Sequence, residues 1–143
     1  MKYTKEVKIN LSRKKVISLF DNPDNLVKWQ KGLVSFETFS GKPGQPGAKS
    51  KLKYKMGKRE IEMVETIVKR NLPDEFSGTY EAKNVWNLVE NYFEEVDKNT
   101  TNWRLETEFL CKGYMRVMVF LMPGMFKKQT LQTMLDFKAF AES

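Results

Sequence analysis

The stretch from residue 48 to residue 59, AKSKLKYKMGKR, alternates between lysine and less polar side chains. Because successive side chains of a β-strand point to opposite faces, this period of two predicts a strand with one charged face. Gly57 follows Met56 and favours a positive φ, so residues 56–59 predict a hairpin with a two-residue loop. The lysines of the charged face are Lys49, Lys51, Lys53 and Lys55.

The hairpin loop fixes which side chains face each other across the two strands. On the lysine face it brings Lys55 opposite Glu60 and Lys53 opposite Glu62, so we interpret this face as solvated and ion-paired. A phosphate-binding stripe is the alternative, but the aromatic side chains that could stack on bases lie on the other face. We therefore expect no specific nucleic-acid partner, and only weak contact with anionic surfaces through Lys49, Lys51, Lys53 and Lys55.

The opposite face of this hairpin is apolar except for one carboxyl group. The register pairs Tyr54 with Ile61, and it places Glu65 opposite Ser50 and next to Met63. An unpaired buried carboxylate costs several kcal/mol or takes up a proton, so Glu65 should meet water, a hydrogen-bond donor or a ligand in a cavity. Alternatively, Glu65 lies near a sheet end and reaches solvent.

Seven segments of the chain carry strand patterns, and two short helices follow the first of them. Ser12 is a candidate N-cap for the first helix, and Asn22-Pro23 begins a second one that ends near Trp29. The expected strands are residues 3–9, 34–39, 48–56, 59–69, 75–82, 85–96 and 101–110.

From about residue 113 to residue 142 the period becomes helical, and Pro123 should kink or interrupt this helix. It is the only element large enough to cover the apolar face of an antiparallel sheet, so the order of elements predicts an α+β fold. The side of the helix that faces the core should carry Leu131, Met134, Leu135 and either Phe137 or Lys138.

The hairpin that turns at residues 97–100 has two open registers. With a two-residue loop, Glu90 shares a face with aromatic and aliphatic side chains, whereas a three-residue loop turns Asn87 and Asn91 to that face. A two-residue loop at the preceding turn, residues 82–85, would align the neighbouring strand with the asparagine set. We favour the more apolar set, which consists of Trp86, Leu88, Glu90, Tyr92, Trp103, Leu105, Thr107 and Phe109.

Composition limits what the chain can do. Its 143 residues fit one domain, and 41% hydrophobic and 30% charged residues with a net charge of +7 are typical of a soluble globular protein. No histidine is present, which removes the usual general base and zinc ligand, so any chemistry must run on carboxylates, lysine, tyrosine or a bound cofactor. We expect no metal and no cofactor. Cys111 is the single cysteine and the N-terminus lacks a secretory signal, so we expect a cytoplasmic location. The apolar run at 114–126 is too short to cross a bilayer.

Three stretches resemble a known superfamily: residues 9–54, from INLSRKKV to KLKY; residues 79–109, from TYEAKNVW to LETEF; and residues 131–142, LQTMLDFKAFAE. They are similar to the polyketide cyclase/dehydrase and lipid-transport superfamily, which includes START domains and the birch pollen allergen. The resemblance concerns layout, and no residue matches a catalytic signature. It implies a helix-grip fold, in which a curved seven-stranded antiparallel sheet wraps around the long C-terminal helix and two short helices close one end of a hydrophobic cavity.

Three hypotheses for the function follow. In the first, the protein binds or transports a small hydrophobic or amphipathic ligand, such as a lipid, polyketide or quinone-like molecule. In the second, it is a cyclase- or dehydratase-type enzyme whose catalytic candidates are Glu65, Glu90, Tyr54 and Tyr80. In the third, it binds a partner or a membrane surface, which an exposed apolar patch beside Pro123 would support. The residues expected to line a ligand site are Tyr54, Ile61, Met63, Glu65, Phe76, Tyr80, Trp86, Leu88, Glu90, Tyr92, Trp103, Leu105, Thr107, Phe109, Met118 and Met122.

Overall fold

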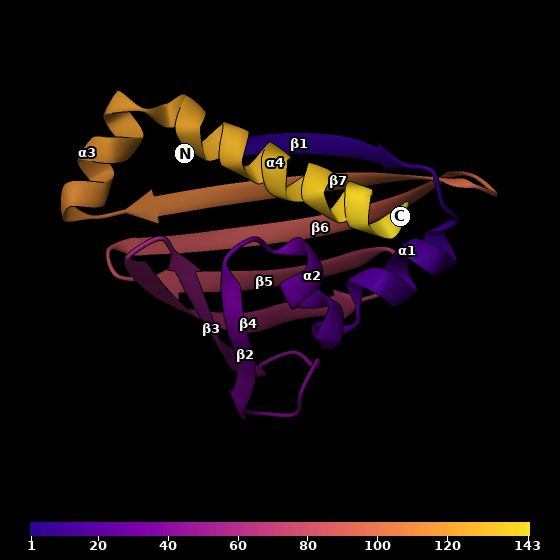
Figure 1. The fold of residues 1–143 in the computed structure, drawn as a ribbon, viewed down its shortest axis with the longest axis horizontal. Helices are drawn as coiled ribbons and strands as arrows, with labels where there is room; N and C mark the ends of the chain where they lie inside the picture. Colours follow the sequence, from indigo (N-terminus) through magenta and orange to yellow (C-terminus); the bar gives the residue numbers. More distant parts are fainter.

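The computed structural model describes residues 1–143, and its strands form one seven-stranded antiparallel sheet in the order β1-β7-β6-β5-β4-β3-β2 (Figure 1). Every predicted strand is present, with ends that differ by at most two residues. The strands are β1 (Lys2–Ile9), β2 (Leu33–Ser40), β3 (Lys49–Met56), β4 (Arg59–Asn71), β5 (Glu75–Ala82), β6 (Val85–Asp97) and β7 (Thr100–Cys111). The helices are α1 (Arg13–Phe20), the 3-10 helix η1 (Pro23–Asn25), α2 (Leu26–Trp29), α3 (Gly113–Leu121) and α4 (Pro123–Ala141).

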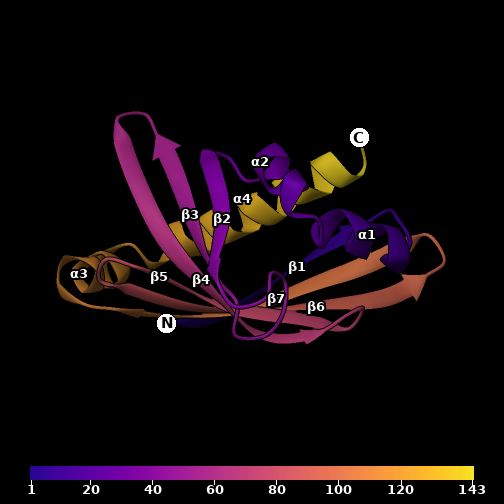
Figure 2. The same cartoon turned by 90° about the horizontal axis from the view of Figure 1, so that it is seen from below.

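The sheet curves strongly, and α4 lies along its concave side. In Figure 2, β2, β3 and β4 rise steeply from the other strands, and α4 crosses between these two parts of the sheet. Helices α1 and α2 lie near the end where α4 finishes, whereas α3 and the tip of the β3–β4 hairpin lie at the opposite end in both views. This is the α+β helix-grip arrangement, so the predicted fold class is confirmed.

The helices begin at the residues that the sequence indicated. Ser12 caps α1, because its Oγ accepts a hydrogen bond from the N–H of Lys15 at 3.2 Å. Asn22 caps η1, where Pro23 occupies the first position and needs no partner for an N–H. Pro123 begins α4 directly after α3 has ended, so the C-terminal helix is interrupted at the expected residue.

The β3–β4 hairpin has the predicted register. Gly57 has a φ of 64° in the loop, and Met56 pairs with Arg59. Lys53 lies opposite Glu62, and the Nζ of Lys51 lies 3.7 Å from a carboxylate oxygen of the same glutamate. The lysine row is therefore a solvated face of the sheet in which Lys51 forms an ion pair, and an exposed pair of this kind stabilises a fold by at most about 1 kcal/mol.

The β6–β7 hairpin corrects the register that we favoured. Its loop contains two residues, 98 and 99, but a β-bulge at Val96 shifts the pairing by one. Because such a shift turns every side chain to the other face, Asn87 and Asn91 lie on the concave side, opposite Phe109 and Leu105. The expected concave placement of four β6 residues is wrong, and the convex face carries Trp86, Leu88, Glu90 and Tyr92.

The hydrophobic core fills one half of the space between the sheet and α4. Phe137 of α4 is fully buried and packs edge-on against Trp29 and Trp103, with ring centroids 5.0 and 5.3 Å away. Leu135 is 41% exposed, so its expected place on the buried side is wrong. The buried residues of α4 are Met134, Phe137 and Ala141, which follow one another at steps of three and four, and Leu135 lies one residue outside this series. The core cluster comprises Val7, Ile9, Val16, Trp29, Phe93, Trp103, Leu105, Met134, Phe137 and Ala141.

Candidate functional site

The other half of the concave face holds the candidate site. One row of side chains crosses five strands there, because the registers place these residues side by side. In contrast to the core cluster, much of this region is partly exposed, including Tyr54, Ile61 and Met63 near the β3–β4 loop. The concave face is thus packed at one end and accessible at the other. The row consists of Ser50, Glu65, Tyr80, Asn87 and Phe109.

Glu65 is the carboxyl group of this row and is only 8% exposed. The hydroxyl of Tyr80 donates a hydrogen bond to Oε2 of Glu65 at 2.8 Å, so a hydrogen-bond donor, one of the expected partners, is present. Burial raises the pKa of Glu65, and the bond from Tyr80 opposes this shift only in part because it stabilises the ionised form. Glu65 therefore takes up a proton more readily than an exposed glutamate.

Tyr54 lies in the same region. Its hydroxyl donates to Oε1 of Gln30, which directly follows α2, at 2.8 Å. Burial raises the pKa of Tyr54 strongly, with a further contribution from the negative charge of Glu65. The same two causes raise the pKa of Tyr80. Both phenols therefore stay protonated at neutral pH and act as hydrogen-bond donors.

Three polar atoms of this region form no hydrogen bond within the chain, namely Glu65 Oε1, Gln30 Nε2 and Asn87 Oδ1. Trp29 Nε1 is the only fully buried side-chain nitrogen or oxygen without a partner, so the other three atoms border accessible space. Asn87 is held in place because its Nδ2 donates to Oγ1 of Thr107 at 2.7 Å. The region therefore offers two oxygen atoms and an amide donor to a molecule that enters.

Four residues expected at the site face away from it, and Glu90 is the most consequential. It lies opposite Glu106 on the convex side and accepts a hydrogen bond from the Tyr92 hydroxyl at 3.3 Å. The Tyr92 ring in turn lies under the Arg104 guanidinium, whose carbon is 4.5 Å from the ring centroid. Glu90 therefore does not meet Tyr80, and the correction removes it as a catalytic candidate together with Trp86, Leu88 and Tyr92 as lining residues.

Several other expected residues lie in the packed half. Trp103 donates from Nε1 to Oδ1 of Asn91 at 3.0 Å, and Asn91 donates onward to the carbonyl of Phe76 at 3.2 Å. Leu105 is buried in the core cluster. The buried amide of Asn91 thus links the indole of Trp103 on β7 to strand β5. These residues support the wall of the site and do not border its accessible end.

Phe109, on β7, is the last residue of the row. Its ring lies 6.1 Å from that of Tyr3 and 5.3 Å from that of Phe126 at the start of α4, measured between centroids. Met118 lies on α3 and is partly buried, and Met122, directly after α3, is 47% exposed. The two methionines therefore belong to the accessible end of the molecule.

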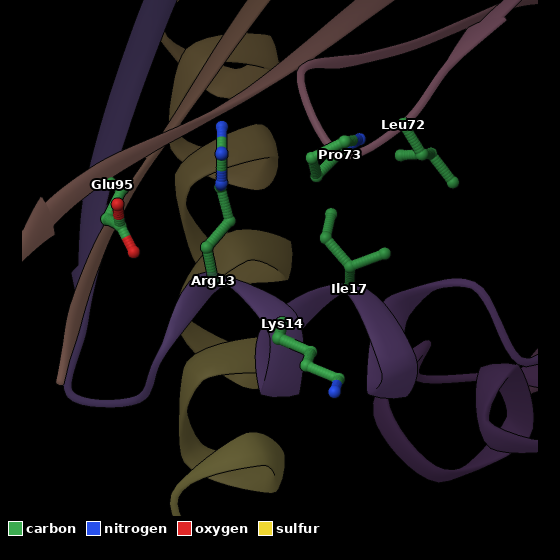
Figure 3. A pocket seen from close by; sticks show the side chains of 6 residues that line it. All are labelled: Arg13, Lys14, Ile17, Leu72, Pro73 and Glu95. Carbon is green, nitrogen blue, oxygen red and sulfur yellow. The ribbon is translucent and has the colours of Figure 1, made fainter. Parts of the chain in front are cut away.

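Two surface pockets lie away from the row. One of about 420 Å³ lies between α1 and the β4–β5 turn and is lined by Arg13, Lys14, Ile17, Leu72, Pro73 and Glu95 (Figure 3). Its Arg13 already donates to Asp74 at 2.9 Å. The other, of about 370 Å³, lies over β1, β7 and β6 and includes Glu90 and Glu106. No group of three or more metal-ligating side chains comes together in the chain.

The fold is shared with solved structures of several proteins. A conserved protein from Geobacillus kaustophilus superposes with a TM-score of 0.81 at 12% identity, over 99% of this chain and 95% of that chain. An aromatase/cyclase from a Streptomyces species gives 0.80 at 10% identity, over 99% and 93%. Norcoclaurine synthase from Thalictrum flavum, in complex with dopamine and hydroxybenzaldehyde, gives 0.72 at 14% identity, over 96% and 83%.

These likenesses confirm the resemblance at the level of the fold, and at such identities they establish the fold alone. No protein-family model matches the chain, and no curated protein matches its sequence significantly. The class of protein defined here is thus a helix-grip domain with a buried glutamate and two tyrosines on its concave face. The ligand of that face therefore has to be inferred from the chemistry of the residues that line it.

Replacing Glu65 by glutamine should stabilise the fold increasingly as the pH rises. Because the folded-state pKa of Glu65 is raised, the stability linked to its proton is complete below the ordinary pKa and is lost as the pH rises through the folded value. Glutamine keeps an acceptor for Tyr80 but does not ionise. Thermal unfolding between about pH 4 and about pH 9 measures the difference in melting temperature. Glu60→Gln, on the water-facing side of the same strand, is the control. If the difference in melting temperature between Glu65→Gln and the wild type stayed constant with pH, the raised pKa of Glu65 would be contradicted.

Proposed function

We propose that the protein binds a small apolar or amphipathic molecule in the accessible half of its concave face. The observation that carries this proposal is Glu65, a carboxyl group that is 8% exposed and held by Tyr80 while its second oxygen borders accessible space. Small-molecule sites are typically concave and apolar with a few oriented polar groups. Tyr54, Gln30 and Asn87 complete such a set here.

The free polar atoms favour a ligand with a neutral polar end and an apolar body. A carbonyl or hydroxyl group of the ligand could accept from Nε2 of Gln30 and share a proton with Oε1 of Glu65. The body of the ligand would then contact Phe109 of the row together with Ile61 and Met63, and all three side chains are partly exposed. An anionic end is disfavoured, because it would meet the carboxyl group of Glu65 in a poorly solvated place. Polyketide- and quinone-like molecules fit this description better than fatty acids.

The solved structures support this ligand class. Norcoclaurine synthase holds dopamine and hydroxybenzaldehyde, which are small aromatic molecules with polar substituents, and it has the same fold as this chain. The aromatase/cyclase is named for ring closure and aromatisation. Both likenesses concern the fold, so the proposal depends on Glu65 and its neighbours.

Filling the accessible half should abolish binding. Ala82 lies on β5 two residues beyond Tyr80, on the same face and partly exposed, so Ala82→Trp places a large ring beside the row. We expect native mass spectrometry of the purified wild type to show a co-purifying small molecule, and the variant to lose it. Titration with the uncharged apolar dye Nile red should show binding at least about tenfold weaker in the variant, a loss of about 1.4 kcal/mol.

Ala139→Trp is the matched control, because Ala139 lies on the exposed side of α4. It should leave both measurements unchanged. Equal dye binding by the two tryptophan variants, together with a wild type that carries no small molecule, would overturn the proposed function.

A second candidate function is acid–base catalysis, which the contact between Tyr80 and Glu65 favours. In a cyclase- or dehydratase-type step, Glu65 would exchange a proton with an activated carbon of the substrate while Tyr54 donates a hydrogen bond to a carbonyl oxygen. Glu65→Gln separates the two functions. In both cases the variant should keep its affinity for the small molecule within a few-fold. Only an enzyme would also lose a measurable turnover rate.

A further inference from the structure

Helix α3 has no buried residue, which distinguishes it from every other helix of the chain. Its inward side is apolar, with Met115, Met118 and Val119 partly buried. Its outward side is apolar apart from Arg116, and Phe120 is 83% exposed. A helix with apolar side chains on both sides is normally covered on both. Only one side of α3 is covered by the rest of the chain.

The exposed apolar surface continues past the end of α3 into the first turn of α4. We call this surface the α3 patch. Scattered apolar side chains are common on protein surfaces, whereas a contiguous group of large ones marks an interaction site. The patch consists of Tyr114, Val117, Phe120, Leu121, Met122 and Met125.

Positively charged residues lie within and next to the α3 patch in the sequence, and negatively charged ones are absent from this part of the sequence. No aspartate or glutamate occurs between residues 112 and 135. Arg116 is the only charged residue within 113–126, and it lies on the exposed side of α3. The exposed cations in and beside the patch are Lys112, Arg116, Lys127 and Lys128.

We propose that the α3 patch docks on an anionic lipid membrane surface. An apolar helix side bordered by cations has the chemistry of helices that lie in the interface, with apolar side chains among the acyl chains and cations at the anionic headgroups. The nine residues of α3 extend about 14 Å, less than half of a hydrocarbon core of about 30 Å. No helix of the chain has both the length and the apolar content needed to span a bilayer. The helix therefore lies on the membrane.

Charge also argues against a second copy of this chain as the occupant. A two-fold interface places the same patch on both sides, so Arg116, Lys127 and Lys128 would approach their own counterparts. Such like charges repel one another, whereas phosphatidylglycerol or phosphatidylserine headgroups neutralise them. This inference is independent of the ligand proposed for the concave face, because the patch lies outside the row that contains Glu65.

Vesicle co-sedimentation tests the proposal. The purified protein is mixed with vesicles of phosphatidylcholine alone, or of phosphatidylcholine with about one third phosphatidylglycerol. We expect at least about tenfold tighter binding to the anionic vesicles, and weaker binding at about 0.5 M salt. The double variant Phe120→Ser and Leu121→Ser should bind the anionic vesicles at least about tenfold more weakly. Arg116→Gln with Lys127→Gln should lower binding to the anionic vesicles only.

The matched control is the double variant Val27→Ser and Val96→Ser, since these valines are 55% and 51% exposed and lie outside the patch. It should bind as the wild type does. Hydrogen exchange of residues 113–121 in the unmodified chain gives a readout that needs no variant, and anionic vesicles should slow it.

Three outcomes of the vesicle measurements would overturn the proposal. They are equal binding to neutral and anionic vesicles or to neither, an α3 double variant that binds like the valine control, and exchange that the vesicles leave unchanged. A dimer in sedimentation velocity that the α3 double variant converts to a monomer would assign the patch to a second copy and also overturn it.

Discussion

Phe137→Ala should lower the free energy of unfolding by about 3–5 kcal/mol, which is the largest effect that we expect from a single substitution. Phe137 is fully buried, and its ring centroid lies 5.0 Å from that of Trp29, 5.3 Å from that of Trp103 and 5.8 Å from that of Phe20. Alanine would leave a cavity where α4 meets the sheet and the two short helices. Urea unfolding followed by tryptophan fluorescence measures the change.

Leu135→Ala is the matched control for this prediction. Leu135 lies on the same helix but is 41% exposed, so its truncation should cost less than about 1 kcal/mol. Similar losses for Leu135→Ala and Phe137→Ala would mean that α4 is rotated relative to the arrangement described here.

Asn91→Leu should lower the free energy of unfolding by about 2–4 kcal/mol. The buried amide of Asn91 accepts from the indole of Trp103 and donates to the carbonyl of Phe76. Leucine removes both hydrogen bonds, and a buried polar group that loses its partner costs about 1–3 kcal/mol. The same urea unfolding experiment measures the loss.

Asn102→Leu provides the comparison for Asn91→Leu. Asn102 lies on the convex side of β7 and is partly exposed, so its replacement should change stability by less than about 0.5 kcal/mol. If the register without the β-bulge were correct, Asn91 would face outward and the two variants would behave alike. The pair of variants therefore tests the pairing of β6 with β7.

The two hairpins show what a sequence pattern can determine about register. In β3–β4 a glycine marks the loop and the lysine alternation marks the outer face, so both the loop and every cross-strand pair were predicted. In β6–β7 the extra residue is Val96, a β-branched residue that looks like any other strand residue. Hydrophobicity then favoured the wrong face, because Tyr92 is apolar in most of its surface yet lies under Arg104 on the convex side.

The candidate site was predictable only where it depended on a readable register. Glu65 was expected on the concave face because its strand pairs directly with the lysine strand. Gln30 was not expected, because it lies in a connection between α2 and β2 where no period applies. The sequence pattern leaves two orientations open for Asn87, since its orientation depends on the bulge at Val96. The prediction for Leu135 is wrong because it assigned both Met134 and the adjacent Leu135 to one side, whereas adjacent helix residues point about 100° apart and only Met134 is buried.

The absence of buried residues from α3 has a consequence for how this chain can change. Gly113, with a φ of 54°, and Pro123 delimit the helix, and its residues contribute little to the packed interior. Substitutions on the exposed side of residues 114–121 are therefore released from the packing constraints that hold the core, whereas Met115, Met118 and Val119 stay partly buried. Under the membrane docking proposed above, the surface that selects a location and the residues that specify the fold are largely separate.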